Sequence, residues 1–298
     1  MDKLFEVPYN FSKKLIAFYA RHSSYISYLF VPPYKDDALN TRSTIETKRK
    51  GSCYMPQSRE EYETHLKMIV HAGLRFVVLW QAPNLLLSNY SLDYYVSLGA
   101  SGFIVGNDEN AIRIKAFDSN LIVVCSLIQR VCSDAIFRDF GSYDHVLLYY
   151  PFNRALEALK TLSHIKDKLV LMPNTLCHVD CPSMHHWFPK SSSSFEQKRD
   201  CPVIKNVEMS GFIDPEHLYL FDSLVNGYKI QGREYSTDII IYICSIYFKR
   251  QSAKELLNAM LGDELSESMQ IYNPRIDLQK YYNVKSQPII DGEILYQR

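Results

Sequence analysis

The sequence predicts a (β/α)8 barrel, in which eight parallel strands alternate with helices. Eight short apolar runs occur along the chain, and segments with helical spacing separate them. Most of these runs are continuously apolar, as expected for parallel strands that are covered on both faces. An open doubly wound sheet has the same alternation, but no glycine-rich turn such as GxGxxG follows the first strand. We therefore favour the closed barrel.

The eight predicted strands are bounded by polar, glycine or proline residues. They are Lys3–Val7, Ile26–Val31, Arg75–Trp80, Gly102–Val105, Leu121–Cys125, Val146–Tyr150, Lys168–Met172 and Tyr228–Gln231.

Three of the intervening helices have clear sequence signals. Ser58 and Glu61 match a capping box, and apolar residues follow them at helical spacing. An apolar stripe within residues 155–165 predicts a second helix. Ser236 or Thr237 is the expected cap of a nearly all-apolar helix that continues through Phe248.

The chain of 298 residues is long enough for one large domain. We assign residues 1–250 to the barrel and 251–298 to a helical and extended C-terminal extension, with a helix at Lys254–Leu261. Two connections, Pro32–Gln57 after strand two and Pro173–Gly227 after strand seven, are unusually long. Both leave the C-terminal ends of strands, where barrel enzymes build their active sites.

Charge and hydropathy narrow the class of partner. The 33 Lys and Arg residues balance 33 Asp and Glu residues, which argues against a dedicated binder of nucleic acid or anionic membranes. RNA stays open as a substrate through the local run Lys48-Arg-Lys50. The longest apolar run, Ile239–Ile246, is far short of the roughly 20 residues that span a bilayer, and no signal peptide is evident. We expect a cytoplasmic protein with reduced cysteines that acts on a small molecule or peptide.

The seven cysteines divide into two groups by location. Three fall in predicted strands or helices and are expected to be small core residues: Cys125, Cys132 and Cys244. Four fall in the two long loops: Cys53, Cys177, Cys181 and Cys201. Four thiolates make a complete ligand set for zinc or for an iron–sulfur cluster. His178, His185 and His186 could complete a zinc set instead, for example with Cys177, Cys181, His185 and Cys201.

Several segments together resemble the collagenase-like peptidase family (peptidase U-thirty-two). The similarity is carried by Asn174-Thr-Leu-Cys177-His-Val-Asp-Cys181-Pro182, Cys201, Gly211-Phe-Ile-Asp-Pro-Glu-His-Leu218 and Tyr228-Lys-Ile-Gln-Gly-Arg233. Weaker matches lie upstream, at 121–126 and 141–148, and the resemblance spans roughly residues 51 to 250. The spacing of the cysteines after residue 176 differs from the usual family pattern, and the additional C-terminal domain of longer members is absent.

The resemblance implies a barrel with a cysteine-ligated iron–sulfur cluster, which we take to be four-iron four-sulfur, with zinc as the alternative. Members are named as peptidases, but relatives support oxygen-independent hydroxylation of RNA bases or of ubiquinone precursors. Gly51-Ser-Cys53 looks like the branch that draws one ligand from an early loop. The implied ligands are therefore Cys53, Cys177, Cys181 and Cys201.

The same resemblance names three candidate catalytic residues. Lys229 and Arg233 follow strand eight and are expected near the mouth, where the planar fork of Arg suits a carboxylate or phosphate. Ion pairing with Glu234 or Asp214 is the structural alternative. His178 is a candidate for proton transfer or for a hydrogen bond to a thiolate, and Asn174 is expected to orient the loop.

These observations favour an iron–sulfur barrel protein that hydroxylates or otherwise modifies a small aromatic, nucleoside or peptide substrate. A hydrolase is the first alternative, although the sequence contains no HExxH or GxSxG motif. The second alternative is a non-catalytic subunit, stabilised by metal, that partners a second barrel protein.

Overall fold

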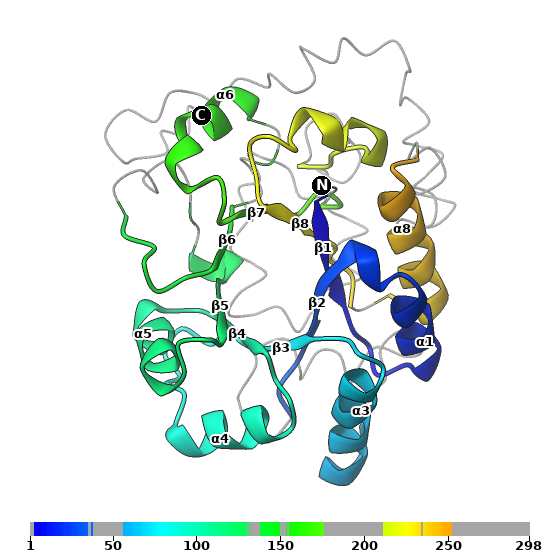
Figure 1. The fold of residues 1–298 in the computed structure, drawn as a ribbon, viewed down its shortest axis with the longest axis vertical. Helices are drawn as coiled ribbons and strands as arrows, with labels where there is room; N and C mark the ends of the chain where they lie inside the picture. Colours follow the sequence, from blue (N-terminus) through cyan, green and yellow to red (C-terminus); the bar gives the residue numbers. More distant parts are fainter. Residues whose placement is uncertain are drawn as a thin grey trace, which may run out of the picture.

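The predicted barrel is confirmed. A computed structural model describes residues 3–34, 37, 56–129, 131, 138–149, 153, 155–175, 211–233 and 235–251. Its eight strands form one closed parallel barrel in chain order, since each pairs with the next and β1 pairs with β8 (Figure 1).

All eight predicted strands are present, and their ends differ from the predicted ends by at most three residues. They are β1 (Leu4–Pro8), β2 (Ile26–Val31), β3 (Phe76–Trp80), β4 (Gly102–Val105), β5 (Ile122–Cys125), β6 (His145–Leu147), β7 (Leu169–Leu171) and β8 (Gly227–Lys229).

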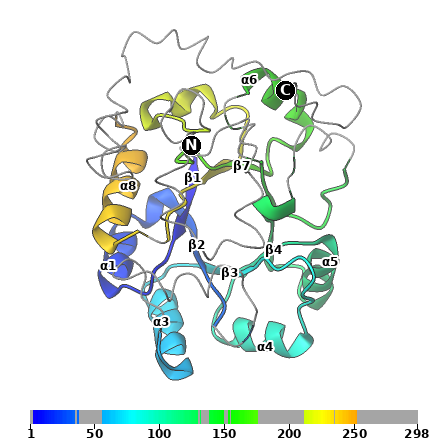
Figure 2. The ribbon, with the colours of Figure 1, turned by 180° about the vertical axis from the view of Figure 1, so that it is seen from behind.

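Helices surround the strands on the outside of the barrel (Figures 1 and 2). They are α1 (Lys13–Arg21), α3 (Arg59–His71), α4 (Asn89–Ser97), α5 (Asp108–Phe117), α6 (Leu156–Thr161) and α8 (Thr237–Lys249). Short 3-10 segments are η1 (Ser23–Tyr25), η2 (Leu127–Gln129), η5 (Ser163–Ile165) and η8 (Pro215–Leu220). Within the ranges described, no helix combines the length and apolar character that crossing a membrane requires.

Side-chain alternation along the strands separates two apolar clusters. One set packs between strands and helices, with Phe5, Leu29 and Phe103 among its members. The other set fills the barrel interior: Tyr28, Phe30, Val77, Leu79, Ile104, Val124, Leu127, Leu147, Tyr149, Val170 and Met172. The interior is therefore a packed core instead of a pore, as expected for eight strands.

Two predicted helix starts are confirmed, although the Glu61 carboxylate bonds the amide before the N-cap and not the N-cap amide of a capping box. Ser58 Oγ accepts a hydrogen bond from the Glu61 amide at 3.1 Å, while Glu61 Oε2 accepts one from the Gln57 amide at 2.8 Å. Ser236 caps α8 by accepting from the Ile239 amide at 3.4 Å. The predicted helix at Lys254–Leu261 lies outside the described residues.

Candidate functional site

Both long connections start from the same rim of the barrel. β2 ends at Val31 and β7 ends at Leu171, and all strands run parallel. In the closed strand order, only β8 and β1 lie between β7 and β2. The segments that carry the loop cysteines therefore follow strands on either side of the β8–β1 pair.

The predicted metal ligands themselves lie outside the described residues. This applies to Cys53, Cys177, Cys181 and Cys201, as well as to His178 and the zinc alternative His185. Among the residues that are described, no group of three or more His, Cys, Asp or Glu side chains could hold a metal ion. The four-cysteine set stays a prediction.

Two of the cysteines assigned to the core are indeed core residues. Cys125, at the end of β5, and Cys244, in α8, are both buried and free. Burial raises the pKa of each thiol to about 12, so neither is a thiolate near neutral pH. Cys132 lies outside the described residues. Thiolate ligands must therefore come from other cysteines.

Lys229 lies inside the barrel. Its Nζ is 3.1 Å from Glu6 Oε2 and 3.6 Å from the centroid of the Phe30 ring. The sequence predicts Lys229 near the mouth, with an ion pair to Glu234 or Asp214 as the structural alternative. The ion pair with Glu6 joins β8 to the neighbouring strand β1, across 223 residues of sequence.

Glu6 is the centre of a polar network in the barrel interior. Tyr28 on β2 donates its hydroxyl hydrogen to Glu6 Oε1. His145 Nδ1, from β6, lies 3.1 Å from the same Oε1 and 3.0 Å from the Tyr28 hydroxyl oxygen. Because the Tyr28 hydrogen already points to the carboxylate, Nδ1 must carry a hydrogen and donate it. Four strands thus contribute to one network.

This network holds Glu6 ionised. Burial alone would raise the pKa of the Glu6 carboxyl, but the Lys229 ammonium, His145 and Tyr28 together lower that pKa to about 2. Burial and the nearby Glu6 raise the pKa of Tyr28 well above its ordinary value, so Tyr28 remains a neutral donor. A buried anion and a buried cation therefore face each other in the barrel interior.

Sequence reasoning missed Glu6, Tyr28 and His145. A signal was available, since Glu6 interrupts the apolar run of the first predicted strand. Glu6 and Lys229 are register partners on adjacent strands and both point inward, so their opposite charges can pair.

At the C-terminal rim of the barrel, Asn174 and Gln231 bond each other. Asn174 Nδ2 donates to the Gln231 carbonyl at 2.8 Å, and the Gln231 amide donates to Asn174 Oδ1 at 2.9 Å. Gln231 Nε2 also donates to the Asn174 carbonyl at 3.0 Å. These bonds tie the chain after β7 to the chain after β8 through Asn174, the residue expected to orient the loop. Arg233 is buried in the turn just beyond.

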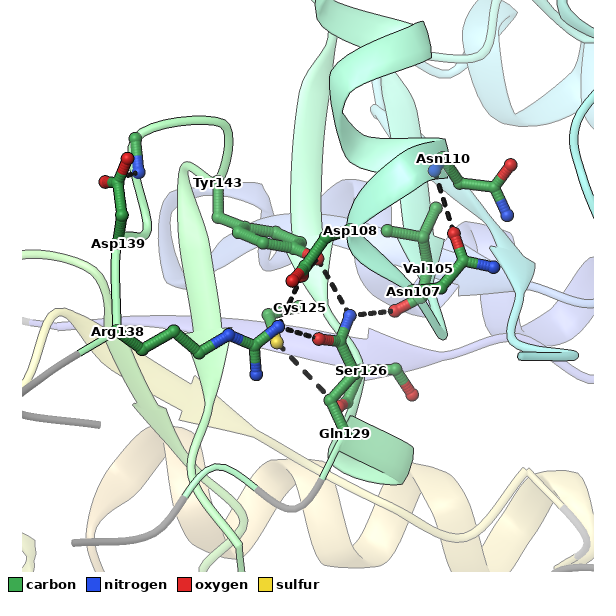
Figure 3. A network of polar contacts seen from close by, with 11 residues as sticks. Val105, Asn107, Asp108, Asn110, Cys125, Ser126, Gln129, Arg138, Asp139 and Tyr143 are labelled. Atoms are coloured by element: carbon green, nitrogen blue, oxygen red, sulfur yellow. Dashed lines mark hydrogen bonds and ion pairs between the residues drawn. The ribbon is translucent and has the colours of Figure 1, made fainter. Parts of the chain in front are cut away.

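A second polar network lies at the ends of β4 and β5, where Figure 3 shows the Arg138 guanidinium directed at Asp108 and Gln129. Gln129 Nε2 donates to the Tyr143 hydroxyl oxygen at 2.8 Å, and Tyr143 in turn donates to Asp108. Asp108 is the first residue of α5, where the helix dipole favours a negative charge. The network joins α5 to the chain before β6, on the side of the barrel opposite β8 and β1.

A third cluster lies at the base of the connection after β2. Arg59 Nη1 donates to Asp37 Oδ2 at 3.1 Å, and the Tyr95 hydroxyl donates to the same oxygen at 2.6 Å. The guanidinium also lies over the rings of Tyr34 and Tyr94, 4.6 and 5.1 Å from their centroids. The cluster thereby joins Asp37 to the first turn of α3. In the sequence, Asp37 and Arg59 lie on either side of the segment that contains Cys53.

Comparisons with known proteins add no family. No family model matches the chain, and no curated protein matches it. Solved structures of tryptophan synthase from M. tuberculosis are similar at 13% identity. An open form with BRD0059 bound has a TM-score of 0.43 and covers 89% of this chain and 91% of that chain. An aminoacrylate-bound form has a TM-score of 0.41 and covers 86% and 91%.

These likenesses carry no argument about reaction or ligand. The strand pairing by itself defines the class, which is a (β/α)8-barrel protein. The particular features of this chain are the ionic network in its barrel interior and the two long connections at one rim.

Proposed function

We propose that this chain is an iron–sulfur barrel protein of the collagenase-like peptidase type, acting as an oxygen-independent hydroxylase or a related modifying enzyme. Its substrate is a small aromatic, nucleoside or peptide. Cys53, Cys177, Cys181 and Cys201 ligate the cluster in this proposal, with zinc as the alternative metal.

The observation that carries the proposal is the shared origin of the two cysteine-bearing connections. Both begin at the C-terminal rim, and only β8 and β1 separate the strands that they follow. Cysteines far apart in sequence can therefore meet above one mouth. The chemistry of the donor set fits as well, because thiolates are the ligands of iron–sulfur clusters, while Cys125 and Cys244 are buried as thiols.

Residues of β8 and its following turn supply the positive charge in this proposal. When bound, the cluster would supply one-electron chemistry. Arg233 binds a carboxylate or phosphate of the substrate through its planar fork. Lys229, held by Glu6, places an ammonium beneath the mouth, and His178 moves a proton beside the ligand set. Phe30, Tyr149 and Met172 provide an apolar floor for an aromatic ring.

Anaerobic purification with iron and sulfide analysis tests the proposal. We expect a brown protein whose visible thiolate-to-iron absorption is lost when any of the four loop cysteines is changed to serine. Cys244→Ala is the matched control and should retain iron, because Cys244 is a core thiol. A colourless, iron-free protein after anaerobic reconstitution, with its thiols intact, contradicts the proposal.

The same preparation separates the alternatives. Stoichiometric zinc without iron favours the metal-stabilised partner subunit, which should then become active only with a second barrel protein. Peptidase activity that survives loss of all four loop cysteines favours the hydrolase.

A further inference from the structure

Carboxamide side chains follow four consecutive strands at the C-terminal rim. Asn153 follows β6, Asn174 follows β7, Gln231 follows β8 and Asn10 follows β1. The amide nitrogen of each donates to a backbone carbonyl. Asn10 Nδ2 bonds the Tyr235 carbonyl at 3.3 Å, and Asn153 Nδ2 bonds the Met172 carbonyl at 2.7 Å. Asn174 and Gln231 bond each other's carbonyls. The donors of this arc are therefore already used within the chain.

The acceptors of two of these side chains are not used. Asn10 is 4% exposed and Asn153 is 0% exposed, and the Oδ1 atom of each is buried with no hydrogen-bond partner. Their orientation is determined, because rotating either amide would set its oxygen against the carbonyl that now accepts from Nδ2. Two fixed acceptors thus flank the β7–β8 segment of the rim.

A buried acceptor without a donor is costly, and folded proteins rarely keep one without a reason. Two on one rim indicate that the missing donors come from a molecule that binds there. A metal cation is a poor occupant, because Lys229 and Arg233 already bring positive charge to β8 and its following turn. A neutral N–H or O–H donor satisfies a carboxamide oxygen without any charge cost.

The apolar surroundings add a second requirement. Asn153 bonds the carbonyl of Met172, whose side chain packs with Phe30 and Tyr149 in the barrel interior. A ligand that reaches the carboxamide arc from the mouth therefore also meets apolar and aromatic side chains. A ring that carries a donor group matches both features.

We propose that the carboxamide arc of Asn10, Asn153, Asn174 and Gln231 binds a small, ring-containing ligand through neutral N–H or O–H donors. Asn10 and Asn153 supply the acceptors, while Asn174 and Gln231 hold the rim between them. The inference concerns the same mouth as the proposed function and names a ligand class for it, but it does not depend on a bound metal.

Three probe compounds test this on the full chain. Benzamide presents N–H donors, benzyl alcohol presents an O–H donor, and N,N-dimethylbenzamide presents none. We expect at least one donor probe to bind about tenfold more tightly than N,N-dimethylbenzamide, the equivalent of one hydrogen bond. The better of the two donor probes identifies the donor type. Equal affinities, or no saturable binding of either donor probe, overturn the proposal.

Variants assign the effect to the arc. Asn153→Ala and Asn10→Ala should abolish the advantage of the donor probes, while Asn120→Ala should preserve it. Asn120 is exposed in the turn before β5, at the opposite end of the barrel, and its amide bonds Asp118. An unchanged advantage in both rim variants overturns the assignment. If a rim variant does not fold, the probe comparison on the unmodified chain decides by itself.

Iron analysis of the same samples distinguishes this inference from the proposed function. Iron-free protein that still discriminates among the probes leaves the carboxamide arc supported and the iron–sulfur proposal contradicted. Protein that holds iron but binds all three probes equally supports the iron–sulfur proposal and contradicts the carboxamide arc.

Discussion

At the residue scale, Glu6 is the side chain on which the barrel interior depends. Its carboxylate accepts from Tyr28 and His145 and pairs with the Lys229 ammonium. Removing Glu6 leaves a buried cation without its anion, which typically costs about 3–5 kcal/mol. We therefore expect Glu6→Gln to lower the free energy of unfolding by an amount of that order near neutral pH, measured by chemical denaturation.

The pH dependence of the same variant reports the lowered pKa. Glu6 has a pKa of about 2 in the folded chain against an ordinary value of 4.5. Because the folded-state pKa is the lower one, ionised Glu6 stabilises the fold above about pH 4.5, and this stabilisation disappears as the pH falls through about 2. It amounts to about 3 kcal/mol. Glu6→Gln should remove that part of the acid destabilisation, whereas Glu157→Gln, on an exposed side chain, should not. Parallel stability–pH curves for Glu6→Gln and the unmodified chain would contradict the assignment.

At this scale the sequence indicates some of the important residues and not others. Lys229 and Arg233 stand out through a local motif, and Cys125 and Cys244 through their apolar surroundings. Glu6 is marked only as a charge within the apolar run of the first strand. Its contact with His145 has no local sign, because 139 residues separate the two and only barrel closure brings them together. Whether the side-chain oxygens of Asn10 and Asn153 have a partner depends on how neighbouring loops pack. Local sequence therefore does not indicate that these oxygens lack a hydrogen-bond partner.

At the scale of elements, periodic apolar runs and caps were sufficient to find all eight strands and the starts of α3 and α8. The long connection after β7 contains η8, which the sequence analysis does not predict. Its signal was local, because Asp214 caps the turn by accepting from the Glu216 amide at 3.2 Å and Pro215 occupies the first position. In the sequence analysis, residues 214–216 contribute only to the family resemblance.

The connection after β2 yields a prediction about element stability. Arg59 combines an ion pair with Asp37 and stacking on two tyrosine rings. Lysine keeps the charge but loses the planar fork and the stacking, so Arg59→Lys should lower the free energy of unfolding by about 1 kcal/mol. Arg113→Lys, at a longer exposed ion pair with Glu109 in α5, should change it by less than about 0.5 kcal/mol. Equal effects of the two substitutions would show that the Arg59 cluster adds no special stability.

At the scale of the whole molecule, the barrel combines an apolar interior with one ion pair between its first and last strands. The pair joins β1 to β8, which is the seam that closes the barrel. Buried ion pairs often contribute little net stability compared with apolar residues of similar size, although breaking one partner is costly. The Glu6–Lys229 pair therefore need not be present for stability, and the proposed function uses its ammonium as a buried cation.

A double-mutant cycle tests whether the Glu6 and Lys229 charges depend on each other for their contribution to stability. We expect Glu6→Leu and Lys229→Met each to destabilise the fold by about 3–5 kcal/mol, because each leaves one buried charge. The double variant should recover most of that loss, since no unpaired charge remains and His145 Nδ1 can still bond the Tyr28 hydroxyl. The exposed pair Lys14–Asp238 is the control, and its coupling energy should be about 1 kcal/mol or less. Additive losses at Glu6 and Lys229 would mean that the two charges do not depend on each other, and the interior network would then have to be explained through Tyr28 and His145 alone.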